Sequence, residues 1–191
     1  MLSRHGIRNP GKKDILHGHA MLSEMKYRGA DPLVVQCLQS VLELFPLSEA
    51  ALLAETGAEE QKELGRRTGQ RYSSLFRKSD HVTFVSSTSP RAISSKKNFE
   101  HGFSEGLGWN VSSSYEQRDD LLRFFDICPD YITKVKKNKT AFAEFNNFRS
   151  KMFPHVVQYI AERLSVDGLN MSDGMLHAAC TYNVINVSYL N

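Results

Sequence analysis

A histidine between two arginines, near the start of the chain, constrains this sequence more than any other feature. The stretch from Arg4 to Pro10 reads RHGIRNP. Its glycine lets the backbone turn tightly, and its proline stiffens the exit from the loop. The guanidinium groups of Arg4 and Arg8 keep their charge near neutral pH and offer planar donor forks to a tetrahedral oxyanion. His5 then has a ring nitrogen that can attack phosphorus. The alternative interpretation is a basic loop that is only solvated by water.

A second anion-binding feature lies in the middle of the chain. Residues 82–85, Val-Thr-Phe-Val, predict a short strand, and the Ser-rich turn after them leads into a helix expected from Arg91 to about Phe103. A helix N-terminus in this position offers unpaired amides and a favourable dipole to an anion. We therefore expect Arg91 to lie near Arg4 and Arg8 in the folded chain. The alternative is an ordinary capped helix with a surface arginine.

Apolar residues at helical spacing predict two helices before the strand. The first is expected from Asp31, its N-cap, through about Phe45. Its apolar face consists of Leu33, Val34, Leu38, Val41, Leu42 and Phe45. The second is expected from about Thr56 to Phe76, with Thr56 and Glu59 in capping-box spacing. Its expected buried side consists of Leu64, Tyr72, Leu75 and Phe76.

The remaining segments are less regular in pattern. Residues 11–28 are interpreted as polar and irregular, and the chain beyond Tyr115 is expected to be mostly helical. Apolar and aromatic faces predict core packing there, and they are formed by Leu121, Leu122, Phe124, Phe125, Phe142, Phe145, Phe148, Val156, Val157, Ile160 and Leu164.

The stretch RHGIRNP resembles the signature of the histidine phosphatases, in which this histidine becomes a phosphohistidine. Its Arg-x-Pro ending is similar to the acid-phosphatase and phytase branch, whereas the mutase-like branch typically continues with Thr and Asn. Residues 86–94, SSTSPRAIS, resemble the family segment that supplies a third phosphate-binding arginine. Residues 121–128, LLRFFDIC, and 135–142, VKKNKTAF, closely resemble the helical region of the multiple inositol polyphosphate phosphatases.

The resemblance implies an α/β fold with an incomplete histidine-phosphatase core over residues 1–115 and a mainly helical subdomain over residues 116–191. It implies a phosphomonoester hydrolase that removes phosphate from inositol polyphosphates, with 2,3-bisphosphoglycerate as another substrate, through a phosphohistidine. The residues that would carry this chemistry are His5 as nucleophile and Arg4, Arg8 and Arg91 as phosphate ligands.

Further basic residues follow the loop. Lys12 and Lys13 either contact outer phosphates of a polyanionic small-molecule substrate or form a solvated basic loop. No metal or other cofactor is expected, because His17 and His19 have no supporting cluster of Cys, Asp or Glu.

The family's late His-Ala-Glu or His-Asp motif, whose acidic residue protonates the leaving oxygen, has no match in this sequence. The nearest stretch is His177-Ala178-Ala179, which has alanine in place of the carboxylate. Because this motif is missing and few residues precede Arg4, the sequence is interpreted as the N-terminal part of a phosphatase: a fragment, a partial gene model or a short isoform. Without the acidic residue it is expected to be weakly active or inactive. The competing hypothesis is a catalytically impaired fragment that captures polyanions.

Composition bears on partners and compartment. A net charge of +3 is too small to indicate a nucleic-acid partner, and no apolar run approaches a membrane span. No signal peptide is expected before the motif. Sequons at Asn110, Asn138, Asn170 and Asn186 nevertheless favour the secretory route: the endoplasmic reticulum lumen, the exterior or the cell surface. Such triplets are also common where they go unused.

The chain has three cysteines, so pairing leaves at least one thiol free. In an oxidising lumen Cys128 and Cys180 are expected to pair, and Cys37 is expected to be a free buried thiol. The alternative is that none of the three is paired.

Overall fold

The computed structural model describes residues 1–178. In chain order the elements are α1 (Lys12–Tyr27), α2 (Pro32–Glu43), η1 (Leu47–Glu49), α3 (Glu55–Arg71), η2 (Ser73–Leu75), β1 (His81–Ser86), α4 (Pro90–Leu107), β2 (Ser112–Gln117), α5 (Asp119–Leu122), α6 (Phe124–Ile127), α7 (Pro129–Tyr131), η3 (Ile132–Lys136), η4 (Thr140–Phe142) and α8 (Ala143–Arg163). The chain is mainly helical with a small parallel sheet, which confirms the expected α/β class.

The described chain forms two compact units. The first consists of Met1–Asn9 and Ala51–Cys128, and the second of Pro10–Ala50 and the described residues from Pro129 onward. The compact units therefore combine segments from both sides of residue 115. The division into domains 1–115 and 116–191 stays a prediction.

The sheet of the first unit pairs β1 with β2 in parallel, with His81 opposite Ser112 and Ser86 opposite Gln117. The expected strand at 82–85 is confirmed, and so is the helix that follows it, α4. Sequence reasoning missed β2, because its sequence SSSYEQ lacks the β-branched and apolar residues that indicate a strand. Its hydroxyls instead reach across to β1, where Thr83 Oγ1 lies 3.0 Å from Ser114 Oγ.

Aromatic side chains form the core of the first unit between the sheet and α4. Phe84, Phe103 and Leu107 are buried there, and Phe76 and Phe99 pack against them. The rings of Phe84 and Phe103 meet edge to face with centroids 6.2 Å apart. This core packs the second half of α4 against β1.

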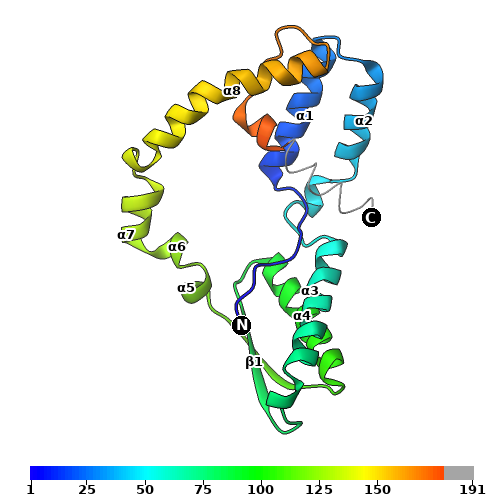
Figure 1. Cartoon of the computed structure of the whole chain (residues 1–191), viewed down its shortest axis with the longest axis vertical. Coiled ribbons are helices and arrows are strands. Elements are labelled where there is room, and N and C mark those ends of the chain that lie inside the picture. The colour runs from blue at the N-terminus through cyan, green and yellow to red at the C-terminus, as the bar shows by residue number, and fades with distance from the viewer. Residues whose placement is uncertain (179–191) are drawn as a thin grey trace. The chain divides into compact units, whose positions relative to one another are not determined.

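Helices α3 and α4 lie side by side and touch backbone to backbone (Figure 1). Gly65 and Gly69 of α3 face α4, and Gly102 and Gly106 of α4 face α3. A Cβ atom at any of these positions would collide with a carbonyl oxygen of the other helix. Each pair is spaced i and i+4, so both glycines of a helix lie on one face.

This glycine face explains why the expected buried side of this helix is only partly right. Phe76 packs against the aromatic core as expected, but the other three residues do not form a buried face. Tyr72 is 42% exposed and Leu75 is 72% exposed, while Leu64 is only half-buried. The expected capping box is also wrong, because α3 begins at Glu55 with Ala54 as N-cap and no side-chain cap. Large apolar residues therefore do not mark the contact face of α3, because its closest contact is made by glycines, which have no side chain.

The second unit contains a helix that sequence reasoning missed. The segment interpreted as irregular is α1, and it buries Ile15, Met21, Leu22 and Met25 at helical spacing. The expected helix α2 is confirmed, with Asp31 Oδ1 accepting a hydrogen bond of 2.7 Å from the amide of Leu33. Its expected apolar face is partly wrong, because the side chain of Leu33 is 70% exposed.

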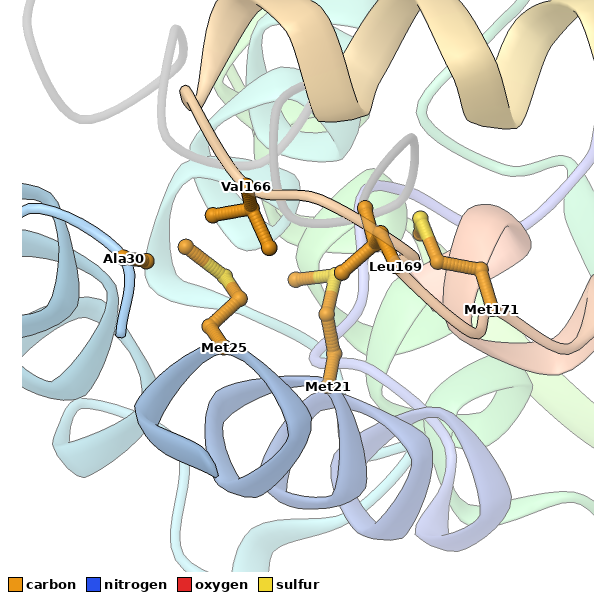
Figure 2. Close-up of a cluster of buried hydrophobic side chains, with 6 residues drawn as sticks. All are labelled: Met21, Met25, Ala30, Val166, Leu169 and Met171. Atoms are coloured by element: carbon orange, nitrogen blue, oxygen red, sulfur yellow. The ribbon is translucent and has the colours of Figure 1, made fainter. Parts of the chain in front are cut away.

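A methionine-rich cluster joins α1 to the segment after α8 (Figure 2). Met21 and Met25 point from α1 toward Val166, Leu169 and Met171. The end of α8 packs against this cluster through Val157, Ile160, Ala161 and Leu164.

The packing expected beyond Tyr115 is confirmed for Val157, Ile160 and Leu164 and wrong for several residues of the other apolar faces. The beginning of α8 exposes Phe145 and Phe148, and Leu121 and Phe124 are also more than half exposed. Within residues 1–178, none of the helices is long and apolar enough to cross a bilayer.

The cysteines differ from expectation in one respect. Cys37 is exposed on α2, so the expected buried thiol is wrong, whereas Cys128 is half-buried and not bonded to another described cysteine. Cys180 lies outside the described residues, so its pairing with Cys128 stays a prediction.

Replacing Gly102 by alanine should destabilise the first unit by about 1–3 kcal/mol, because the new Cβ collides with the backbone of α3. The free energy of unfolding in urea measures the effect. Lys97→Ala, an exposed change on the same helix, is the control and should alter stability by less than about 0.5 kcal/mol. A gain in stability for Gly102→Ala, as for an exposed helical glycine, would contradict the glycine contact.

Candidate active site

The loop that carries RHGIRNP is held by hydrogen bonds to several neighbours in the first unit. The buried amide of Gly6 donates to Ser95 Oγ of α4 at 3.1 Å. The amide of Ala54 donates to the carbonyl of Ile7 at 3.0 Å, just before α3. Gly6 also lies against Gly57, and a Cβ on either residue would collide with the backbone opposite it. The loop is therefore fixed to the beginnings of both α3 and α4.

The ring of His5 is half-buried and has a defined tautomer. Its Nδ1 atom lies 2.8 Å from the carbonyl oxygen of Gly6. A carbonyl oxygen only accepts hydrogen bonds, so Nδ1 carries the proton and Nε2 keeps a lone pair. Burial lowers the pKa of His5, the Gly6 hydrogen bond opposes this shift, and the positive charges of Arg91, Arg4 and Arg8 lower the pKa further. The neutral ring, which is the nucleophilic form, therefore prevails at pH 7.

Arg91 stands at the beginning of α4 with unsatisfied polar atoms around it. Burial lowers the pKa of Arg91, and the charges of Arg8, Arg123 and Arg4 lower it further. The Nε atom of Arg91 and the Oγ atom of Ser89 are both buried without a hydrogen-bond partner among the described residues. Ser89 is only 7% exposed. Such orphaned groups are costly unless a ligand satisfies them, and an oxyanion would accept from both.

These residues line one cavity of about 1240 Å³ within the first unit. Its cationic lining consists of Arg4, Arg91, Lys96 and Arg123, and its polar residues include His5 and Ser89. The remaining wall is largely apolar. Among the described residues, no Asp or Glu lines the cavity, so its fixed charges are positive. The cavity is larger than a single phosphate group requires.

The other predicted residues lie elsewhere. Arg8 contributes charge to His5 and Arg91 but does not line the cavity. Lys12 and Lys13 are exposed in the first turn of α1, in the second unit. His177 is in the second unit, where its Nε2 atom lies 3.7 Å from Asp14 Oδ1.

No group of three or more metal-ligating side chains occurs within residues 1–178. His17 and His19, the histidines that follow the RHGIRNP loop, therefore belong to no such group of His, Cys, Asp and Glu side chains within the described residues.

The cavity residues that sequence reasoning missed include Ser89, Lys96 and Arg123. Ser89 was visible only as one serine of a Ser-rich turn, and Arg123 only as one residue of the stretch LLRFFDIC. A strand-turn-helix pattern predicts an anion site but does not say which hydroxyl remains unpaired. No local sequence pattern indicates that Arg123 lines the cavity, because only the tertiary fold brings its segment there.

Comparison with known proteins shows the family to which the chain belongs. The family model of the histidine phosphatase superfamily, branch 2, matches residues 1–183, and the chain belongs to this family. It is 23% identical over 186 residues to multiple inositol polyphosphate phosphatase 1 of Gallus gallus, covering 95% of this chain and 42% of that protein. It is 25% identical over 207 residues to the Homo sapiens protein of the same name, covering 96% and 42%. The chain thus spans about two fifths of the length of these relatives.

Replacing Arg91 by glutamine should raise the pKa of His5, because it removes a positive charge that disfavours the imidazolium. Protonation of the ring would then begin at a higher pH as the pH falls. Histidine ¹H–¹⁵N NMR spectra recorded against pH measure this directly. Arg118→Gln removes the same charge from an arginine outside the cavity and is the control. An unchanged or lowered pKa in Arg91→Gln would refute the electrostatic contact.

Proposed function

We propose that this chain supplies the nucleophile and the phosphoryl-binding groups of a phosphomonoester hydrolase that acts on inositol polyphosphates. One observation carries the proposal: the Nε2 atom of His5 is unprotonated in a cavity that also contains Arg4, Arg91 and the unpaired Ser89 hydroxyl. A nucleophile beside clustered guanidinium groups is the arrangement that phosphoryl transfer through an enzyme-bound intermediate requires. Membership of the histidine phosphatase superfamily supports the same reaction class.

The first step is attack of His5 Nε2 on phosphorus. The N–P bond forms while the P–O bond to the leaving group breaks, and the leaving oxygen takes up a proton from solvent water. Nδ1 keeps its proton throughout, so the hydrogen bond to Gly6 stabilises the charge that develops on the phosphorylated ring. In the second step water attacks phosphorus, the N–P bond breaks, and inorganic phosphate leaves with His5 neutral again.

The arginines stabilise the transferred group electrostatically. A phosphomonoester is dianionic near neutral pH, and its charge spreads over the equatorial oxygens during transfer. Arg4, Arg8 and Arg91 provide positive charge around His5, and Ser89 offers a further donor. This cluster performs the role that a bound cation performs in other phosphoryl-transfer sites.

The substrate class follows from charge, size and relatives together. A cationic cavity of about 1240 Å³ accommodates a small molecule that carries several phosphates. The relatives from chicken and human are named for multiple inositol polyphosphates. We include 2,3-bisphosphoglycerate as a second substrate. Contacts of Lys12 and Lys13 with outer phosphates stay a prediction, because both lysines belong to the second unit.

A second candidate function is polyanion binding with little turnover. It is favoured by the absence of any carboxylate from the cavity lining within the described residues. Expulsion of an alkoxide without a positioned acid forgoes a factor of about a hundred to ten thousand in rate. The two candidates share the same cavity and differ in the first step of the reaction, the expulsion of the leaving group.

The compartment remains a proposal as well. Asn110 and Asn170 are exposed and accessible to glycosylation in the secretory pathway. Asn138 is less accessible, since its Nδ2 atom donates to the carbonyl of Lys134 at 3.0 Å. Asn186 lies outside the described residues.

His5→Ala should abolish covalent phosphorylation of the chain, because the only proposed nucleophile is removed. Incubation with an aryl phosphate, followed by detection of acid-labile, base-stable phosphate, measures the label. His19→Ala changes an exposed histidine of α1 and should keep the label. Equal labelling of His5→Ala and the unmodified chain would overturn the proposed mechanism.

The rate of phosphorylation should depend steeply on the leaving group. No described carboxylate in the cavity can protonate the leaving oxygen, so an aryl phosphate, which needs little protonation, should react at least about a hundredfold faster than an alkyl phosphate. Single-turnover rates with phenyl and ethyl phosphate test this. Similar rates would show that an acid acts at the site, and they would remove the support for the binding-only candidate.

A further inference from the structure

Arg123 lines the same cavity as His5 and Arg91 but has a different local partner. Its Nε and Nη2 atoms donate to Asp126 Oδ2 at 3.0 and 2.7 Å. Both hydrogen bonds use the side of the guanidinium group that faces Asp126, and Nη1 is left for a ligand. The charge of Arg123 also acts on Arg91, which lowers the pKa of Arg91.

The segment that carries Arg123 is fixed to the turn that carries Arg91. Asp119 accepts hydrogen bonds from the amide of Thr88 at 2.9 Å and from Thr88 Oγ1 at 2.5 Å. The amide of Arg123 in turn donates to the carbonyl of Asp119 at 2.8 Å. Thr88 immediately precedes Ser89, so a short chain of hydrogen bonds sets the position of Arg123 relative to the phosphate-binding turn.

A purely structural role does not explain this placement. The pair of Arg123 with Asp126 is spaced i and i+3 and is about one-third exposed on both sides, and such surface pairs contribute little stability. Placing Arg123 within electrostatic reach of Arg91 opposes stability, because like charges repel. An anion between the two arginines would reverse the sign of this interaction.

We propose that Arg123 binds a second phosphate group of the substrate, adjacent to the phosphate that His5 attacks. This inference rests on the proposed function and extends it. Asp126 holds the guanidinium group in place when the cavity lacks substrate. On binding, the second phosphate replaces Asp126 as the hydrogen-bond acceptor of Arg123. The site therefore selects molecules with neighbouring phosphates over monophosphates.

The test compares the affinity of the chain for inositol hexakisphosphate and for myo-inositol 1-phosphate by calorimetry. The His5→Ala background is used so that neither ligand is consumed. Arg123→Ala should weaken hexakisphosphate binding on the order of tenfold more than monophosphate binding, because charge-assisted hydrogen bonds to one phosphate are lost. Arg123→Lys should recover part of this ratio, since the charge remains.

A neighbouring ion pair provides matched controls. Arg118 and Asp120 form a surface pair of similar geometry outside the cavity. Arg118→Ala removes the same charge and should leave the affinity ratio unchanged. Asp126→Asn should raise hexakisphosphate affinity more than Asp120→Asn does, because Asp126, unlike Asp120, accepts hydrogen bonds from Arg123. This comparison decides the question even if Arg123→Ala does not fold.

Two results would overturn the proposed subsite. One is an equal loss of affinity for both ligands in Arg123→Ala. The other is an equal change in hexakisphosphate affinity in Asp126→Asn and Asp120→Asn. Phosphate release by the chain with His5 intact is measured separately. If release is absent while the affinity ratio still depends on Arg123, the hydrolase proposal fails and the second-phosphate site stands.

Discussion

Backbone-to-backbone contact through glycine is the constraint on which the rest of the first unit depends. Gly6 lies against Gly57, and the glycines of α3 and α4 bring those helices to the same close distance. Because no side chain intervenes, the loop that carries His5 reaches the beginning of α4, where Ser95 accepts the hydrogen bond of the Gly6 amide. Arg91 begins the same helix. His5 and Arg91 thus line the same cavity because glycines allow a close packing that large side chains would prevent.

The electrostatics of the cavity oppose folding and favour binding. Arg4, Arg8, Arg91 and Arg123 act on one another or on His5, and the described lining contains no carboxylate to compensate. Burial and then this repulsion lower the pKa of Arg91, and the buried donors of Arg91 and Ser89 have no partner among the described residues. A bound phosphate would offset these costs together, so ligand and fold are linked: an anion that binds only the folded unit stabilises it by mass action.

The elements with strong local signals were predictable from sequence, and those held by tertiary contacts were not. The β-branched run of β1 and the Asp-Pro beginning of α2 led to correct predictions. Polar β2 was missed because it pairs through backbone and hydroxyl groups, and α1 was missed although Ile15, Met21, Leu22 and Met25 share one face. For α3 the helix was predicted but not its contact face, because the apolar pattern reports large side chains and the contact is made by glycine.

The same distinction runs through the site. RHGIRNP is local, so His5, Arg4 and Arg8 were predictable from a few residues, and Arg91 followed from the strand-turn-helix pattern. Arg123 was not predictable in this way, because an arginine with an aspartate three residues later predicts a surface ion pair, and the structure contains that pair. Its second role depends on Asp119 and Thr88, which hold its segment beside the turn of Arg91. A weak, exposed ion pair is also the kind that a phosphate can displace, so the feature that makes Arg123 look unremarkable in sequence is what would let it exchange partners.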